Sequence, residues 1–404
     1  MTVNNTPPLI GLAELMRKTV SGEDLAALGE RLIERANTEA DANALMDLST
    51  LLQLRGNRDL ALVTQAEAIR AQQIYTPPTA SGKIALRVCC LMSRGDLMAN
   101  TPLEFLLENS DVALHLVYIT ENQPLPAQLP EHDVLFVAIA QSDDNMPLLR
   151  ELDATLASWP RPVLNQPARI ALLSRNNAPE LLKSLPGVTM PVTMRLDRQI
   201  LEAVGQGIIP ISRHLEDGDF PVIVRPVDSH AGHGLDKIAD RQALEDYLRN
   251  HDDSEFYLSR FIDYRGPDGL FRKYRVVLIA GRPFICHLGI SEHWMIHYLN
   301  AGMAKSAEKR AEEAAVMAAF DTGFAARHAE ALRGIHERTR LDYVGIDCGE
   351  TADGRLLIFE VDSCMIVHAL DPVDLFPYKQ PQMRTVFSAF RDMLVNAARG
   401  SLAL

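Results

Sequence analysis

Apolar residues recur at helical spacing from residue 8 to about residue 74, and this pattern predicts a helical domain over residues 1–75. The stretches LAELMRKTV, DLAALGERLIERA and ALMDLSTLLQLRG carry the pattern most clearly. Residues 76–82, TPPTASG, combine proline, glycine and small polar residues, a composition that favours a linker. The helices would form either a packed hairpin or dimerisation element, or a groove that binds a peptide.

Beyond the linker, apolar residues occur in short runs instead. IALRVCCLM, ALHLVYIT and DVLFVAIA have the length and composition of buried strands, and helical stretches alternate with them. This alternation predicts an open α/β sheet in a domain over residues 83–190. The turn after the first strand lacks the glycine fingerprint of dinucleotide-binding proteins. Arg94 in this turn is a candidate substrate contact, because the carboxyl ends of strands line the crevice in such sheets.

The composition is that of a globular protein with an acidic charge. The 404 residues include 40 Lys and Arg against 53 Asp and Glu, which gives a net charge of −13. An acidic chain offers no overall attraction for nucleic acid or for anionic membranes. No apolar run approaches the roughly 18–20 residues of a membrane-spanning helix, and the N-terminus lacks the pattern of a secretory signal. The five cysteines include no CxxC pair. We therefore expect a cytoplasmic protein that binds neither nucleic acid nor membrane.

A glycine-containing loop after a strand is the first candidate site. In FPVIVRPVDSHAGHGLDKI, residues 220–238, the strand ends in the cation Arg225. Small residues in the following loop leave backbone N–H groups exposed, and such groups bind phosphate oxygens. A cation beside the loop would neutralise phosphate charge. The loop residues of interest are Ser229, His230, Gly232 and Gly234.

A predicted β-hairpin is the second candidate. The stretch KYRVVLIAGRPFICHL, residues 273–288, reads as two strands that meet at a turn of Ala280 and Gly281. The hairpin places Lys273, Arg275 and His287 on strands of one sheet. Lys273 and Arg275, together with Arg225, could offset the charge of bound phosphates.

Three carboxylates in apolar strand sequences form the third candidate. Glu360 and Asp362 point to one face because they are two positions apart on a strand. Asp347 ends the preceding strand, which we expect to be the antiparallel neighbour. Three like charges in a buried setting are costly unless a cation lies between them. Oxygen ligands of this kind suit Mg²⁺ that is carried with the phosphates of a nucleotide.

In this order, the glycine loop, the hairpin and the acidic strands resemble the ATP-grasp superfamily. The resemblance covers about residues 83–395, and residues 42–75 resemble one tetratricopeptide unit. It implies an α/β protein with an ATP-grasp domain over residues 191–404, preceded by the open α/β domain and the helical domain. It also implies ATP and Mg²⁺ as cofactors.

The resemblance implies a role for individual residues. Arg225 stands where the family usually has a lysine, and Asp362 where it more often has an asparagine. The loop from Ser229 to Gly234 would cover the phosphates. Contact with the transferred phosphate is the role implied for Arg275, Lys273 and Asn300. Contact with adenine is implied for Ser259, Arg260, Phe261 and Ile262. Mg²⁺ ligation is implied for Asp347, Glu360 and Asp362.

The segment HLGISEHWMIHYLNAGM, residues 287–303, is rich in side chains that can line a substrate pocket. Each histidine there can equally be a core or helix-cap residue. No HExxH or other dense ligand spacing supports a zinc site. The candidate substrate contacts are His287, Trp294, His297, Tyr298 and, outside the segment, His368.

Members of the resembled superfamily mostly join a carboxylate to an amine. ATP phosphorylates the carboxylate, and the amine then displaces phosphate. We therefore expect an ATP-dependent carboxylate–amine ligase that acts on small molecules or on a peptide acceptor. Two alternatives remain open: a kinase on the same fold, and a helical-repeat interaction protein whose nucleotide site is regulatory. A homodimer is the expected assembly.

Overall fold

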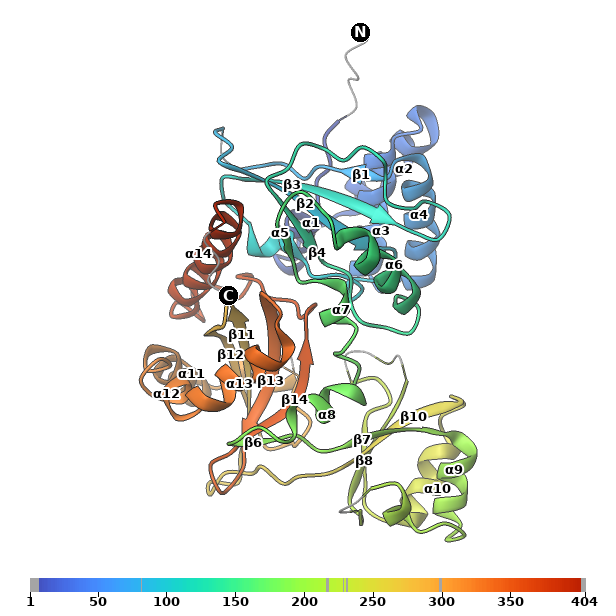
Figure 1. The fold of residues 1–404 in the computed structure, drawn as a ribbon, viewed down its shortest axis with the longest axis vertical. Coiled ribbons are helices and arrows are strands. Elements are labelled where there is room, and N and C mark those ends of the chain that lie inside the picture. Colours follow the sequence, from blue (N-terminus) through green and yellow to red (C-terminus); the bar gives the residue numbers. More distant parts are fainter. Residues whose placement is uncertain are drawn as a thin grey trace. The chain divides into compact units, whose positions relative to one another are not determined.

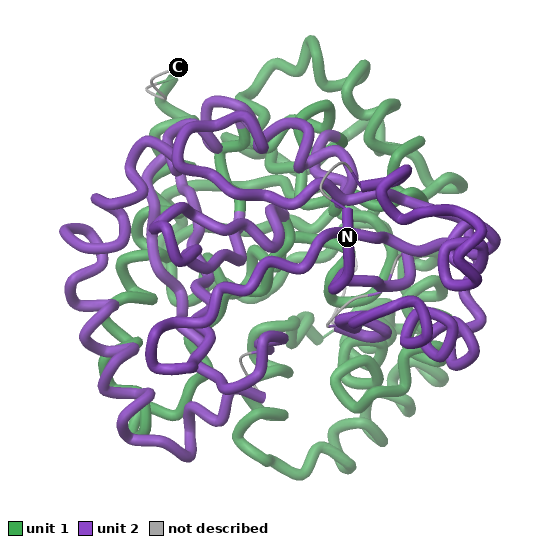
Figure 2. The backbone as a smooth tube through the Cα atoms, turned by 90° about the horizontal axis from the view of Figure 1, so that it is seen from below, with its two compact units in different colours: residues 1–171, 341–344, 363–404 green, residues 172–340, 345–362 purple. Residues whose placement is uncertain are grey.

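The chain is a mixed α/β protein that divides into two compact units (Figure 2). The computed structural model describes residues 7–80, 82–215, 218–227, 229, 232–297 and 300–400. Unit 1 comprises Met1–Ala171, Leu341–Val344 and Ser363–Leu404, and unit 2 comprises Leu172–Arg340 and Gly345–Asp362. Within the described ranges, no helix is long and apolar enough to cross a membrane.

The helices predicted at the N-terminus are present in unit 1 (Figure 1, blue). They are α1 (Leu12–Val20), α2 (Ala26–Glu39), α3 (Ala42–Leu54) and α4 (Arg58–Ala71). Asp41 caps α3, because its side chain accepts hydrogen bonds from two backbone N–H groups in the first turn. A buried cluster between these helices contains Leu25, Leu32, Ala44 and Leu51. The apolar spacing in the sequence predicted the helices because these residues face the cluster.

A five-stranded sheet in the order β1-β3-β2-β4-β5 completes the core of unit 1. Its strands are β1 (Ile74–Tyr75), β2 (Leu86–Ser93), β3 (Val112–Ile119), β4 (Val134–Val137) and β5 (Val163–Leu164). β1 is antiparallel to β3, and the other pairs are parallel. The central strands are almost entirely buried, as expected of a parallel sheet covered on both faces. The remaining helices are α5 (Leu103–Leu106), α6 (Met146–Leu156), α7 (Pro167–Ile170) and α14 (Lys379–Ala398).

Unit 2 contains an antiparallel sheet in the order β7-β10-β8-β9. Its elements are β7 (Thr193–Asp197), β8 (Val222–Pro226), β9 (Asp236–Ile238) and β10 (Glu255–Arg260), with the helices α9 (Arg198–Gly205) and α10 (Arg241–Arg249). Leu201 of α9 and Leu244 of α10 share one buried cluster with Val222 and Phe256 of the sheet. This packing fixes β8 and therefore the start of the glycine loop.

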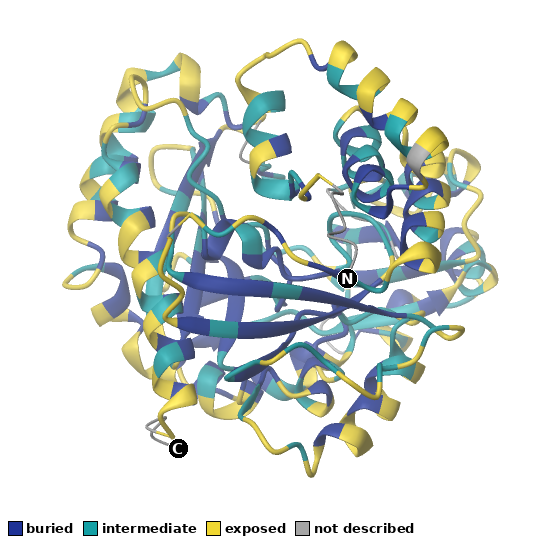
Figure 3. Cartoon of the chain, turned by 90° about the horizontal axis from the view of Figure 1, so that it is seen from above, coloured by how far each residue is buried: buried dark blue, intermediate teal, exposed yellow. Residues whose placement is uncertain are grey.

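A second sheet of unit 2 has the order β12-β11-β13-β14-β6. Its strands are β6 (Val188–Thr189), β11 (Phe271–Ile279), β12 (Arg282–Ser291), β13 (Tyr343–Glu350) and β14 (Leu356–Asp362), and the remaining helices are α8 (Asn177–Leu182), α11 (Ala307–Ala318), α12 (Phe324–Arg327) and α13 (Ala329–Thr339). The predicted hairpin is confirmed as β11 and β12. Ala280 and Gly281 have φ values of 47° and 77°, as a tight two-residue hairpin turn requires. In Figure 3, the strands are mostly buried, and the exposed positions lie mainly on helices and loops.

Candidate functional site

The hairpin and the acidic strands lie side by side in the second sheet of unit 2, in the order β11-β13-β14. Lys273 and Arg275 are on β11, Asp347 on β13 and Glu360 on β14. Asp347 lies directly opposite Glu360 in the antiparallel register, as the sequence predicted. The register shifts immediately after Arg275 and immediately after Asp347. Such bulges re-aim side chains and are common beside active sites.

Asp347 is the centre of a buried ion-pair cluster. Its side chain is almost inaccessible, and the residue is 3% exposed. Lys273 Nζ lies 2.7 Å from Oδ2, while Arg275 Nε and Nη2 lie 2.8 and 2.9 Å from Oδ1 and Oδ2. Burial alone would raise the pKa of Asp347, but the charges of Arg275 and Lys273 outweigh burial and lower it. The carboxylate is therefore ionised and holds both cations in place.

Glu360 has its own cation, which the sequence analysis did not identify. Arg175 Nη2 lies 2.5 Å from Glu360 Oε1. Burial would raise the pKa of Glu360, whereas the charge of Arg175 lowers it, and the lowering prevails. Arg175 comes from the segment before α8 and belongs to no recognisable motif. An isolated basic residue outside any motif gives no sequence signal, so only the fold could assign it to this site.

Arg225 ends β8 as a buried cation, 8% exposed. Its Nε donates to Ser229 Oγ at 3.1 Å, and Nη2 donates to the Ser229 carbonyl oxygen. Among the described residues, no carboxylate forms an ion pair with Arg225. Burial and the neighbouring charge of Arg175 lower the pKa of Arg225 to about 10. The charge of Glu360 acts on Arg225 in the opposite direction, but no described carboxylate is in ion-pair contact with this guanidinium, so an anion bound there would stabilise it.

The glycines of the loop after β8 permit close contacts that a side chain would prevent. Gly232 and Gly234 have φ values of +73° and +64°. A Cβ atom at Gly232 would meet His297 Nε2 at 2.3 Å, and one at Gly234 would meet the ring of Pro226 at 2.6 Å. The loop therefore packs against His297. Burial and then the charge of Lys273 lower the pKa of His297, so its imidazole is neutral near this positive cluster.

Protein cations pair with two of the three carboxylates that the sequence predicts as Mg²⁺ ligands. Asp347 pairs with side chains of β11, and Glu360 pairs with Arg175. Asp362 ends β14 opposite Gly345. In the part of the chain that the structure describes, no group of three or more His, Cys, Asp or Glu side chains could hold a metal ion. The role of Asp347, Glu360 and Asp362 as Mg²⁺ ligands stays a prediction.

No family model matches this chain, and no curated protein matches it. Solved structures do show similarity. The D-Ala:D-Ser ligase VanG from Enterococcus faecalis is 15% identical, with a TM-score of 0.48 over 78% of this chain and 99% of that chain. The RimK domain protein ATP-grasp from Sphaerobacter thermophilus is 18% identical, with a TM-score of 0.45 over 76% of this chain and 99% of that chain. The D-alanine–D-alanine ligase from Bacillus anthracis complexed with ATP is 14% identical, with a TM-score of 0.47 over 79% of this chain and 98% of that chain. These identities and TM-scores are low, so they transfer no activity to this chain.

The residues predicted to contact adenine lie on β10 and in the segment after it. Ser259 pairs with Ile223 in the register of β8, Arg260 is exposed, and Ile262 is half-buried. The ring of Phe261 packs edge-on against Trp294 with centroids 5.7 Å apart. The ammonium group of Lys237 lies 3.7 Å from the centroid of the Phe261 ring. These contacts join Trp294, a predicted substrate residue, to the predicted adenine segment.

The other predicted site residues have local roles in the structure. Asn300 is exposed, and its Oδ1 accepts a hydrogen bond from the backbone N–H of His297 at 3.0 Å, so it shapes the turn that holds this histidine. His287 is the cross-strand partner of Arg275 and lowers the pKa of Asp347 slightly. His230 and Tyr298 lie outside the described residues.

Arg94 and His368 belong to unit 1 rather than to the unit that contains the ion-pair cluster. Arg94 is exposed in the turn after β2. The His368 ring packs edge-on against Phe105 at 5.9 Å, and its Nδ1 accepts a hydrogen bond from the Leu370 N–H. The role of both residues as substrate contacts stays a prediction.

The site carries an excess of positive charge. Its cations are Lys273, Arg275, Arg175 and Arg225, and its carboxylates are Asp347 and Glu360. The cations exceed the carboxylates even when Asp362 is counted with them. Clustered guanidinium and ammonium groups in a partly dry setting bind phosphate oxygens strongly. The arrangement can therefore bind a polyanion.

Proposed function

We propose that this chain is an ATP-dependent ligase that joins a carboxylate to an amine through an acyl phosphate. One observation carries the proposal: the buried Arg225, which has no carboxylate partner among the described residues, beside a cluster of further cations on β11 and at Arg175. A buried guanidinium that served only the stability of the fold would be expected to have a carboxylate partner. The order of the elements that bear them agrees with the resemblance to ATP-grasp proteins.

In this proposal, the triphosphate of ATP is the missing counter-ion. Arg225 and the loop after β8 hold the first phosphates, with backbone N–H groups at Gly232 and Gly234. Lys273 and Arg275 turn from Asp347 to the terminal phosphate. The energy of these contacts is largest where water is excluded, because charge-assisted hydrogen bonds strengthen in a low dielectric.

Mg²⁺ fits this site as an ion that arrives with the nucleotide. Carboxylate oxygens are the donors that Mg²⁺ prefers, and Asp347 and Glu360 lie at opposite register positions. Their oxygens now accept from Lys273, Arg275 and Arg175, so they become available once these cations contact phosphate. We propose Asp347, Glu360 and Asp362 as the ligands. The bound ion would supply further neutralisation of phosphate charge.

The reaction then needs mainly positioning and charge stabilisation. A carboxylate oxygen of the substrate attacks the γ-phosphorus, and the bond from this phosphorus to the bridging oxygen breaks, which releases ADP and leaves an acyl phosphate. The amine nitrogen attacks the acyl carbon, phosphate leaves, and the nitrogen loses its proton. Lys273 and Arg275 stabilise the charge on the phosphoryl oxygens. We assign neutral His297 as the acceptor of this proton.

Calorimetric titration with ATP and Mg²⁺ tests the nucleotide site without a substrate. Arg225→Ala should weaken ATP binding by about 10–100-fold, the effect of removing one charge-assisted hydrogen-bond donor. Arg282→Ala is the matched control, because Arg282 is an exposed arginine of β12 that contacts the Phe284 ring. Equal affinity in wild type and Arg225→Ala would refute the phosphate site.

The ligase reaction is tested separately from nucleotide binding. Amino acids and short peptides are screened for ADP release that requires both a carboxylate and an amine. Hydroxylamine in place of the amine should give a hydroxamate, because it attacks an acyl phosphate. ADP release that leaves a stable phosphorylated product would assign the chain to the kinases instead.

A further inference from the structure

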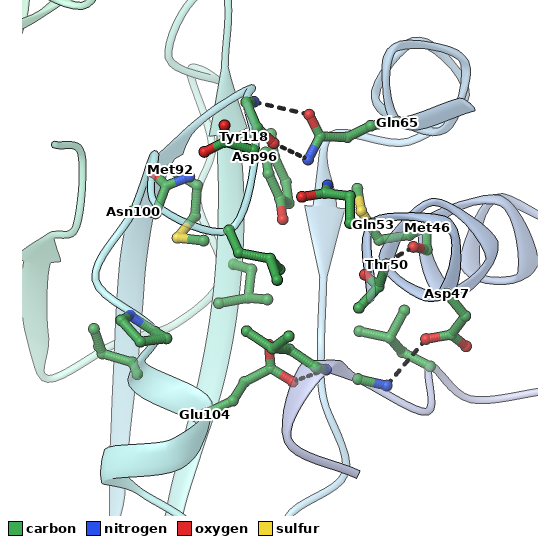
Figure 4. A pocket seen from close by; sticks show the side chains of 18 residues that line it. Met46, Asp47, Thr50, Gln53, Gln65, Met92, Asp96, Asn100, Glu104 and Tyr118 are labelled. Atoms are coloured by element: carbon green, nitrogen blue, oxygen red, sulfur yellow. Dashed lines mark hydrogen bonds between the residues drawn. The ribbon is translucent and has the colours of Figure 1, made fainter. Parts of the chain in front are cut away.

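Unit 1 contains a cavity of about 60 Å³ that the proposed ligase reaction does not use (Figure 4). It lies between residues of α1 and α3 on one side and residues of β2, β3 and α5 on the other. A volume of this size holds about four to six water molecules. Lining side chains include Asp47, Gln53, Glu104 and Tyr118, which are labelled in the figure.

The carboxylates of Asp47 and Glu104 line this cavity. In the hydrogen bonds that the structure records, their donors are backbone N–H groups alone. Asp47, 1% exposed, accepts from the N–H groups of Ile10 and Gly11 at 2.8 and 3.0 Å. Glu104 accepts from the Leu12 N–H at 2.8 Å. Gly11 has a φ of +86°, and a Cβ atom there would lie 2.4 Å from Glu104 Oε1. The glycine therefore allows the carboxylate to approach the backbone. No Lys, Arg or His is among the described residues that line the cavity.

Two uncharged polar groups of the cavity lack a hydrogen-bond partner among the described residues. Gln53 Oε1 is buried without a donor. Tyr118 is 7% exposed, and no hydrogen bond of its hydroxyl is found within the described ranges. The side-chain amide of Gln65, which also lines the cavity, is satisfied, because it forms two hydrogen bonds with the backbone of Gly95. Buried polar groups in proteins are normally satisfied, so an open acceptor and an open hydroxyl indicate a missing occupant with donors.

We propose that this cavity binds a small organic ammonium ion of about four to six non-hydrogen atoms. Its N–H groups would donate to Glu104 and Gln53 Oε1, and its charge would balance the carboxylates. An anion would be repelled by the same carboxylates. Water can satisfy the hydrogen bonds but leaves the buried negative charge uncompensated. The inference does not rest on the proposed ligase reaction, because the cavity lies in unit 1 and the cation cluster in unit 2.

The electrostatics of the two carboxylates agree with a missing cation. Burial raises the pKa of Glu104 to about 7, and the N–H of Leu12 offsets only part of this. Burial also raises the pKa of Asp47 to about 6 against its two backbone N–H donors, with smaller contributions from the charges of Arg35 and Asp41. Both carboxylates would be ionised at pH 8, and a cation bound beside them would stabilise the ionised forms.

The test uses the full chain at pH 8 with the series from methylammonium to butylammonium, followed by thermal unfolding and calorimetry at constant ionic strength. At least one member should bind saturably and raise the melting temperature. An alcohol and a carboxylate of the same chain length should have no such effect. The absence of saturable binding by every ammonium ion, or equal binding of the matched alcohol, would overturn the proposal.

Three variants locate the binding. Glu104→Gln should weaken the affinity for the best ammonium ion by about tenfold or more, since it removes a charged acceptor. Tyr118→Phe should weaken it by about two- to tenfold and leave the melting temperature of the ligand-free protein unchanged, because its hydroxyl has no partner to lose. Tyr75→Phe is the matched control. Tyr75 is also buried, but its hydroxyl donates to the Ala68 carbonyl oxygen at 2.7 Å, and the residue does not line the cavity.

The control variant should lower the melting temperature and leave the ammonium affinity unchanged. If Glu104→Gln does not fold, Tyr118→Phe decides the question alone. Wild-type affinity in Tyr118→Phe together with wild-type affinity in Glu104→Gln would place the binding elsewhere and overturn the assignment of this cavity.

Discussion

Asp347→Asn is the substitution that tests the cation cluster most directly. The carboxylate of Asp347 accepts from Lys273 and from both Nε and Nη2 of Arg275, and the three side chains are 4%, 14% and 21% exposed. Removing one partner of a buried ion pair costs about 3–5 kcal/mol, because the remaining charges stay buried without compensation. This is a large part of the roughly 5–15 kcal/mol that stabilises a typical domain.

Urea unfolding can measure this loss in unit 2 alone. The chain has two tryptophans, Trp159 in unit 1 and Trp294 in unit 2. A Trp159→Phe background therefore leaves a single tryptophan, in the unit that contains Asp347. Glu350→Gln is the matched control on the same strand, because Glu350 pairs with the exposed Arg327 and with His328. The control should lose less stability, since its main ion pair is largely solvated.

An anion should restore the stability that Asp347→Asn loses. Without Asp347, Lys273 and Arg275 bind metal-free tripolyphosphate in place of the carboxylate, and the variant should bind it more tightly than wild type. At a concentration one hundred times the dissociation constant, the anion adds about 2.7 kcal/mol to the free energy of unfolding. If Asp347→Asn is as stable as wild type, the ion pairs contribute nothing. If the variant is destabilised and tripolyphosphate raises the stability of neither the variant nor wild type, the cluster is structural and binds no phosphate.

Two further substitutions address the catalytic charge and the pH dependence of unit 1. Glu360→Gln should abolish ATP turnover while the melting temperature stays near that of wild type, because its partner Arg175 is partly solvated; turnover near the wild-type rate would exclude Glu360 from the reaction. The pKa of Glu104 is raised from 4.5 to about 7 in the folded protein, so the stability that its protonated form contributes is complete below about pH 4.5 and is lost as the pH rises through 7. Glu104→Gln should remove this loss. Relative to wild type, the free energy of unfolding should rise by at most about 3 kcal/mol at pH 8 and by almost nothing at pH 4, as measured by urea unfolding with Trp159 as the reporter. A variant that is destabilised equally at both pH values would contradict the raised pKa.

The strands of the site could be predicted from the sequence because the relevant rules are local. Alternating or continuous apolar runs identified the strands, and two residues with left-handed backbone fixed the turn between β11 and β12. The spacing between Glu360 and Asp362 on one strand, with Asp347 on its antiparallel neighbour, also follows from strand geometry, and the register confirms it.

The partners of these carboxylates could not be predicted, because they depend on tertiary contacts. Lys273 and Arg275 reach Asp347 only because β11 lies next to β13, a pairing of strands about 70 residues apart in the chain. Arg175 comes from a segment without periodicity or motif. The sequence could therefore show that buried carboxylates need a cation, but it could not tell a protein side chain from a metal ion.

The same reasoning separates the two acidic clusters of this protein. Asp347 in unit 2 is buried beside two cations, and its pKa falls. Asp47 and Glu104 in unit 1 are buried with backbone N–H groups as their hydrogen-bond donors, and their pKa values rise. The chemistry of each missing partner follows from what the described residues leave uncompensated. We therefore propose an anion for unit 2, where no described carboxylate is in ion-pair contact with Arg225. We propose an ammonium ion for unit 1, where no described cation lines the cavity of the two carboxylates.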